Sequence, residues 1–210
     1  VVARQADLGL AFDGDGDRLG VVTNRGDIIY PDRQLLLFAQ DILSRNPGAK
    51  VIYDVKSTRH IKTVVAEHGG EAIMCRTGHS LVKACLKAEA ALLAGEMSGH
   101  IFIKERWFGF DDSLYVAARL LEIVSKAGCT VDALFQMLPD SVNTPEIKVP
   151  VAEDKKFKFM HQFSQIAEFP EATVITLDGL RVEYPHGWGL LRLSNTSPNL
   201  TLRFEADNQE

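Results

Sequence analysis

The segment VIYDVKSTRHIKTVVAEHGGEAIM, residues 51–74, decides the fold class. Its first three residues and residues 72–74 are short apolar runs of the kind that form buried strands. Between them, Ser57 or Thr58 is expected to cap a helix, which paired glycines end after His68. A helix between two strands, with short links, predicts that the strands are parallel and that the helix covers one face of their sheet.

The same alternation extends on both sides of this segment. Further strands are predicted at 8–12, 19–22, 28–30 and 90–93, and further helices at 31–45, 81–87, 111–127 and 130–139. The pattern changes near residue 143, where it begins to predict strands at 146–151, 173–177, 180–184, 189–193 and 200–205, with an amphipathic helix at 155–167. The expected fold is a mixed, mainly parallel α/β sheet region, followed by an α+β C-terminal domain with a helix on an antiparallel sheet.

The composition excludes several classes of partner. The 210 residues have an ordinary hydrophobic content of 46% and a net charge of −5. No overall positive field would attract nucleic acid, and no apolar run is long enough to span a bilayer, so neither nucleic acid nor membrane is expected as a partner. The three cysteines fit no zinc pattern, which predicts reduced thiols in a cytoplasmic protein. The first residues include no Met and no signal-peptide pattern, so we expect a fragment.

The strand predicted at 8–12 runs directly into DGDGDR, residues 13–18, which we call the metal loop. Glycines between the carboxylates let the backbone turn, so that three hard oxygen ligands can converge on one ion. An EF-hand is a poor match, because its twelfth position would be Asn24 and its sixth would be Arg18 instead of glycine. Three carboxylates leave coordination positions open, which suits Mg2+ that also contacts a phosphate oxygen. The alternatives are an acidic turn without an ion, and an Arg18 that neutralises the carboxylates instead of binding a phosphoryl group.

Three motifs together resemble a known family. Residues 12–18, FDGDGDR, resemble the metal loop of the alpha-D-phosphohexomutases. Residues 95–100, GEMSGH, resemble the loop with which that family recognises its sugar, and we call them the sugar loop. Residues 192–198, RLSNTSP, resemble its C-terminal phosphate-binding loop. Because the three motifs occur in the family's order across the chain, the sequence is identified as a member, most similar to the bacterial phosphomannomutase/phosphoglucomutase branch.

The resemblance implies that the chain is part of a four-domain protein. Residues 1–29 would end the second domain and carry the metal loop. Residues 30–142 would form the third domain, which recognises the sugar, and residues 143–210 would form most of the C-terminal, phosphate-binding domain. The first domain, with the serine that carries the phosphoryl group, has no counterpart in this sequence. The fragment alone is therefore expected to be inactive and to need that phosphoserine domain as its partner.

The family's reaction, as the resemblance implies it, moves a phosphoryl group between O1 and O6 of mannose or glucose through a bisphosphorylated hexose. Such a monomeric enzyme would act on hexose phosphates in carbohydrate metabolism, for exopolysaccharide and lipopolysaccharide precursors. One Mg2+ per chain would be held by Asp13, Asp15 and Asp17, and Arg18 would stabilise the transferring group.

The resemblance also implies roles for residues outside the metal loop. His79 and Lys56 would lie near the reacting oxygen, with His79 as a general acid or base, although each could instead be solvated or a cap. Glu96 and Ser98 would bind O3 and O4 of the sugar, and His100 would be a substrate contact or a packed strand residue. The residues expected to hold the non-reacting phosphate are Arg192, Ser194, Asn195, Thr196 and Arg203.

Three alternatives stay open at this point. Phosphoglucosamine mutases usually carry Gln where Met97 stands and Gly where Asn195 stands, so the sequence favours mannose and glucose phosphates. The fragment alone could be a non-catalytic module that binds sugar phosphate or metal. A metal-dependent phosphatase has less support, because no second Asp-x-Asp pair follows a predicted strand.

Overall fold

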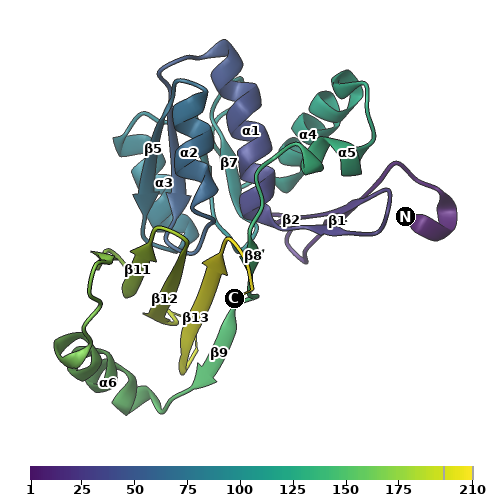
Figure 1. Cartoon of the computed structure of the whole chain (residues 1–210). Helices are drawn as coiled ribbons and strands as arrows, with labels where there is room; N and C mark the ends of the chain where they lie inside the picture. Colours follow the sequence, from purple (N-terminus) through teal and green to yellow (C-terminus); the bar gives the residue numbers. More distant parts are fainter. Residues whose placement is uncertain (196, 210) are drawn as a thin grey trace. The chain divides into compact units, whose positions relative to one another are not determined.

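The computed structural model describes residues 1–195 and 197–209. The chain divides into two compact units, Val1–Pro139 and Asp140–Glu210. Helices surround a mixed sheet in the first unit, and the second unit combines one helix with an antiparallel sheet (Figure 1). The fold class predicted from the sequence is confirmed. The domain limits expected after residues 29 and 142 stay predictions.

The main sheet of the first unit consists of β4 Lys50–Asp54, β5 Glu71–Cys75, β6 Leu93–Gly95 and β7 Ile101–Ile103. The strands lie in the order β5-β4-β6-β7. β4 pairs in parallel with both β5 and β6, and β7 pairs antiparallel with β6. β4 is apolar over most of its length, as expected of a parallel strand that is covered on both faces.

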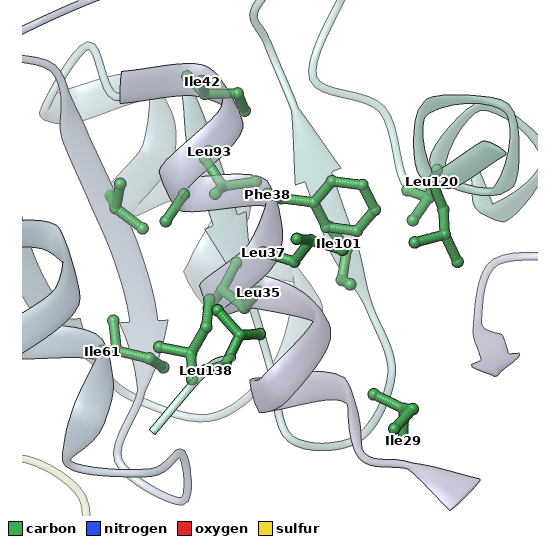
Figure 2. Packing of buried hydrophobic residues seen from close by; sticks show 14 of the residues in the cluster. Ile29, Leu35, Leu37, Phe38, Ile42, Ile61, Leu93, Ile101, Leu120 and Leu138 are labelled. Atoms are coloured by element: carbon green, nitrogen blue, oxygen red, sulfur yellow. The ribbon is translucent and has the colours of Figure 1, made fainter. Parts of the chain in front are cut away.

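Helices cover both faces of this sheet, because successive side chains of a strand point in opposite directions. Val51 of β4 belongs to a core cluster with Phe38 and Ile61, which lie on two helices of the first face (Figure 2). The next residue, Ile52, belongs to a second cluster with Val82, on the helix that covers the other face. These and the remaining helices of the unit are α1 Pro31–Arg45, α2 His60–Glu67, α3 His79–Ala88, α4 Ser113–Ala127 and α5 Val131–Gln136.

An antiparallel hairpin precedes the main sheet. It joins β1 Leu8–Phe12 to β2 Leu19–Thr23, with β3 Ile28–Ile29 on the other side of β2. Phe12 pairs with Leu19, so the metal loop is the connection that closes this hairpin. The hairpin is fixed to the rest of the unit because Leu19 is buried in the main core cluster.

Some boundaries differ from those predicted. The sequence did not predict β7, whose three residues directly follow the sugar loop. α2 begins at His60, later than the predicted cap implies, and Arg59 before it makes no capping side-chain hydrogen bond; the Thr58 hydroxyl accepts the His60 N–H at 3.3 Å. The Ser57 hydroxyl is engaged elsewhere, since it donates to the Asp54 carboxylate at 2.6 Å. α4 begins at Ser113, two residues later than expected, because Asp112 is its cap.

The second unit has an antiparallel sheet in the order β10-β11-β12-β13-β8, and β9 also pairs with β13. Helix α6 packs against β12 and β13. The elements are β8 Val142–Asn143, β9 Ile147–Pro150, α6 Glu153–Ile166, β10 Thr173–Ile175, β11 Leu180–Tyr184, β12 Gly187–Leu193 and β13 Asn199–Ala206. Among the described residues of either unit, no helix has the length and apolar character needed to cross a membrane.

A buried ion-pair cluster fastens the segment after β7 to helices α1 and α4. The Glu105 carboxylate accepts hydrogen bonds from Arg119 at 2.7 Å, Arg106 at 3.1 Å and Arg45 at 3.2 Å. Arg119 also donates to Asp41 of α1 at 2.8 Å. Burial opposes ionisation of Glu105, but the three arginines outweigh it and lower the pKa of its carboxyl to about 2. This carboxylate therefore stabilises the unit as an anion.

We predict that Glu105→Gln lowers the free energy of unfolding by about 3 kcal/mol at pH 7, as measured by urea denaturation. The folded-state pKa lies below the ordinary value of 4.5, so the stabilisation is present above pH 4.5 and is lost as the pH falls toward 2. The matched control is Glu89→Gln, which removes an exposed pair with Lys50 and should cost less than about 1 kcal/mol. Equal, small losses in both variants would contradict the assignment.

Candidate functional site

The metal loop is ordered by its first carboxylate. Asp13 Oδ1 accepts the backbone N–H groups of Asp17 and Arg18, each at 3.2 Å. Gly16 has a φ of +75°, in the left-handed region that favours glycine, and its carbonyl accepts the Ser113 hydroxyl at 2.5 Å. The loop is thus shaped from within and anchored to the start of α4.

The three loop carboxylates fit a divalent cation. One oxygen each from Asp13, Asp15 and Asp17 lies within 4.8 Å of the others. Burial raises the pKa of Asp17, and the neighbouring carboxylates raise it further. Asp17 Oδ1 is buried and has no hydrogen-bond partner among the described residues. Hard oxygen donors, mutual repulsion and an unsatisfied buried oxygen together suit Mg2+.

Arg18 is the nearest counter-charge to these carboxylates. Its Nε donates to Asp13 Oδ2 at 2.5 Å and lies 3.6 Å from Asp17 Oδ1. Burial opposes ionisation of Asp13, but hydrogen bonds from Arg18 lower the pKa of that carboxyl to about 2. The side chain of Arg18 is 48% exposed. It therefore offsets part of the negative charge of the loop and is also accessible to a ligand.

The sugar loop is the turn between β6 and β7. The Glu96 N–H donates to the His100 carbonyl at 2.9 Å, and the Gly99 N–H donates to the Glu96 carbonyl at 3.1 Å. The Glu96 carboxylate is buried and accepts the Gly78 N–H at 2.5 Å and the exposed Ser98 hydroxyl at 3.1 Å. Burial, followed by the charge of Asp54, raises the pKa of Glu96. The loop therefore holds a buried carboxylate that is protonated more readily than an exposed one.

The metal loop and the sugar loop lie side by side. Arg18 and His100 form an antiparallel backbone bridge between them. Gly99 has a φ of +111°, and a Cβ at this position would lie 3.2 Å from Arg18 Cβ. Two of the three motifs read from the sequence thus form one surface within the first unit.

Two histidines share one aspartate next to this surface. His100 Nδ1 lies 3.1 Å from Asp111 Oδ1, and His79 Nδ1 lies 3.8 Å from Asp111 Oδ2. Burial would lower the pKa of His100, but the hydrogen bond and charge of Asp111 raise it. The two imidazole rings are 5.5 Å apart. His100 is therefore held by a carboxylate instead of being packed only among apolar strand residues.

Lys56 lies in a buried polar cluster at the carboxyl end of β4. Its side chain is 5% exposed, and its Nζ lies 3.9 Å from Asp54 Oδ2. Asp54 is fully buried and accepts the Ser57 hydroxyl at 2.6 Å, the Thr77 hydroxyl at 3.0 Å and the Met97 N–H at 3.2 Å. A freely solvated Lys56, which the sequence left open, is therefore excluded.

The sequence analysis did not select Asp54 or Asp111 as site residues. Asp54 ends a strand of a parallel sheet, where ligands commonly bind, and this position was the available signal. Asp111 precedes Asp112 and was included in the predicted helix, although it forms an antiparallel bridge with Phe102 beside β7. Asp111 and His100 are well separated in the sequence, so their spacing alone does not indicate that the two side chains meet.

In the second unit, Arg192 lies near the end of β12, and Ser194 and Asn195 follow that strand. Arg192 is 4% exposed and pairs with Asp178, with 3.2 Å from its Nη2 to Oδ2. The Ser194 hydroxyl lies 2.8 Å from that of Ser197. Asn195 is exposed, and the predicted site residue Thr196 lies outside the described residues.

Arg203 is more deeply buried than a ligand-binding cation usually is. It lies on β13, is 1% exposed, and its guanidinium carbon is 5.8 Å from the centre of the Trp188 ring. Arg192 pairs with Thr201 across the two strands, so Arg192 and Arg203 are on the same face of the sheet. The two cations that the sequence analysis proposed for one phosphate thus share a face, with Arg203 packed against an aromatic ring.

Comparison with known proteins agrees with the fold and the motifs. The model of the phosphoglucomutase/phosphomannomutase alpha/beta/alpha domain III matches residues 30–142, and that of the C-terminal domain matches residues 146–210. The chain belongs to the phosphoglucomutase/phosphomannomutase family, which confirms the resemblance inferred from the three motifs.

Several individual proteins of this family are similar to the chain. It is 59% identical over 203 residues to the phosphomannomutase/phosphoglucomutase of Pseudomonas putida, covering 97% of this chain and 44% of that protein. It is 58% identical over 210 residues to the Pseudomonas aeruginosa PAO1 protein of the same description, covering 100% and 45%. A crystal structure of a phosphoglucomutase/phosphomannomutase family protein from Burkholderia thailandensis matches with a TM-score of 0.92 and 55% identity, covering 100% of this chain and 45% of that chain. The chain thus spans slightly less than half the length of these relatives.

We predict that Gly99→Ala disturbs the metal loop, because the added Cβ would push against Arg18 and both loops would have to adjust. The backbone amide NMR signals of residues 13–18 should shift in this variant. Gly48→Ala is the matched control, since Gly48 also has a positive φ, +84°, but has nothing within 4 Å of the added Cβ. Both variants should lose on the order of 1 kcal/mol of stability to backbone strain. Unshifted metal-loop signals in Gly99→Ala would show that the two loops are not mechanically coupled.

Proposed function

We propose that the chain supplies the metal-binding, sugar-recognising and phosphate-binding parts of a hexose phosphate mutase. The enzyme would interconvert the 1- and 6-phosphates of mannose, glucose or both through a bisphosphorylated hexose. The observation that carries this proposal is the adjacency of the metal loop and the sugar loop, bridged at Arg18 and His100. A group transferred at the metal loop would then be within reach of a hexose bound at the sugar loop.

Asp13, Asp15 and Asp17 would hold one Mg2+, which when bound offsets negative charge on a phosphoryl oxygen. Arg18 is half exposed at the edge of this loop, and its guanidinium would bind the equatorial oxygens of the group in transfer. The short Asp13–Arg18 pair holds that guanidinium in place before substrate arrives.

Glu96 and Ser98 would recognise the sugar. A carboxylate can accept hydrogen bonds from two neighbouring hydroxyls at once, which suits O3 and O4 of a hexose. Mannose and glucose differ at O2, so contacts to O3 and O4 would accept both sugars. The Gly78 N–H holds one oxygen of Glu96, and the exposed Ser98 hydroxyl donates to the other.

His79, His100 and Lys56 would serve the reacting hydroxyl. Asp111 lies close to both imidazoles. Burial would lower the pKa of His100, but the hydrogen bond and charge of Asp111 raise it, which favours the protonated ring as a donor to a substrate oxygen. The side chain of His79 is 55% exposed and is free to approach a sugar oxygen. Lys56 would add positive charge at the carboxyl end of β4.

The phosphate that does not react would be held by the second unit. Arg192 and Ser194 are described at the end of β12, and Asn195, Thr196 and Arg203 complete the proposed set. Binding energy from this remote phosphate would orient the reacting end of the sugar. The proposal further includes a phosphoserine donor supplied by residues outside these 210, and a monomeric, cytoplasmic enzyme of carbohydrate metabolism.

The test mixes this chain with a phosphorylated N-terminal portion of a phosphomannomutase/phosphoglucomutase. Mannose 1-phosphate and glucose 1-phosphate should be converted to their 6-phosphates, as followed by phosphorus NMR. Asp15→Asn should reduce the rate by about 100-fold or more, because one ligand of the metal is lost. Asp27→Asn, an exposed carboxylate on the turn before β3, should leave the rate unchanged.

Three results would count against parts of the proposal. Binding of sugar phosphate without any exchange would leave a non-catalytic module. Conversion that is insensitive to Asp15→Asn would remove the metal loop from the reaction. A strong preference for glucosamine phosphate would favour the phosphoglucosamine mutase alternative.

A further inference from the structure

A second group of potential metal ligands adjoins the metal loop. Ligand atoms of Asp17, His100 and Asp111 all lie within 4.8 Å of one another. His100 Nδ1 is 3.1 Å from Asp111 Oδ1 and 3.7 Å from Asp17 Oδ2. The three side chains come from the metal loop, the end of the sugar loop and the segment before α4, and all are less than one-third exposed. This group shares only Asp17 with the carboxylates of the metal loop.

The spacing of these atoms matches the coordination of a small transition-metal ion. Tetrahedral ligands at ~2.1 Å from Zn2+ are separated from one another by ~3.4 Å. The two distances from His100 Nδ1, 3.1 and 3.7 Å, bracket that separation. Only small side-chain shifts would be needed to bring all three ligands onto one ion, and three protein ligands leave the fourth tetrahedral position for a water molecule.

The donor set differs from that of the metal loop. The metal loop offers carboxylate oxygens alone, which suit Mg2+. The second group replaces one carboxylate by an imidazole nitrogen, and imidazole favours ions such as Zn2+, Cu2+ and Ni2+. Asp17 Oδ1 is buried without a hydrogen-bond partner among the described residues, so this side chain has an acceptor to spare.

The neighbouring cations do not close the site. Lys83 Nζ lies 3.9 Å from Asp111 Oδ2, but its side chain is 40% exposed and can move into solvent. Arg18 pairs mainly with Asp13, and its Nε lies 3.6 Å from Asp17 Oδ1, but its side chain is 48% exposed and can also move. His79 Nδ1 lies 3.8 Å from the second oxygen of Asp111, where it could hold that carboxylate in position.

We propose that Asp17, His100 and Asp111 form a second divalent-cation site, selective for borderline transition metals of the Zn2+ class. An ion there would draw Asp17 away from Mg2+ and occupy the Nδ1 atom of His100. If the chain acts as the mutase proposed above, on which this consequence rests, occupancy of the second site inhibits it. The site itself needs no substrate and no phosphoserine, so it can be tested on the chain alone.

The test adds Cu2+ to the 210-residue chain at one equivalent and records its electron paramagnetic resonance spectrum. Nitrogen splitting from an imidazole ligand is expected, and a large excess of Zn2+ should diminish it by competition, because Cu2+ binds such ligands more tightly than Zn2+ does. His100→Gln should abolish this splitting, and Asp111→Asn should weaken Zn2+ binding at least about tenfold in a dialysis assay. Asp13→Asn, which alters only the metal loop, should leave the splitting in place.

A matched control excludes ordinary surface histidines. His186 also pairs with an aspartate, with 2.9 Å from its Nδ1 to Asp207 Oδ2, but it is 88% exposed. His186→Asn should not change the spectrum. Nitrogen splitting that survives His100→Gln, or disappears in His186→Asn, would overturn the proposal. Loss of Mg2+ binding in Asp13→Asn with the nitrogen signal retained would separate the two sites, whatever the mutase assay shows.

Discussion

The buried carboxylate of Asp54 is the constraint on which the arrangement of the first unit depends. An anion with no exposed surface must have its oxygens satisfied, and leaving them unpaired would cost several kcal/mol. Its partners come from three different loops: Ser57 after β4, Thr77 after β5 and Met97 after β6. Because parallel strands end at the same edge of a sheet, one carboxylate can gather all three loops. The same loops carry Lys56, His79 and Glu96.

The carboxyl groups of this unit differ in pKa because their surroundings differ. Asp13 meets Arg18 and stays ionised well into the acid range, whereas partly buried Asp17 and buried Glu96 lie near other carboxylates and have raised pKa values. Glu105 illustrates the contrast, because its three arginine partners outweigh its burial. The same kind of side chain thus has three roles here. It is a group that stays ionised, a structural anchor, or an acceptor that a bound cation would stabilise. Their neighbours decide which role each one has.

The sequence predicted those features that reside in contiguous residues. The strand–helix alternation and the metal and sugar loops could be read because each pattern occupies a few adjacent positions, and the same holds for the change of architecture near residue 143. β7 escaped prediction because its three residues gain their conformation from pairing with β6. Asp111 was not predicted as a site residue because its role depends on contact with His100, and that contact forms only when the chain folds. Likewise, no local pattern indicates that Arg203 packs against Trp188.

The contact between Gly99 and Arg18 has a consequence for how such a chain can change over time. The two positions belong to loops separated by more than half of the first unit's sequence, yet a Cβ added at Gly99 would lie only 3.2 Å from Arg18 Cβ. A substitution in either loop that moves its backbone is acceptable only if the other loop moves with it. The effects of substitutions in the two motifs are therefore expected to depend on one another, so that the two motifs evolve together. Drift in sugar preference would then require paired changes on both sides of this contact.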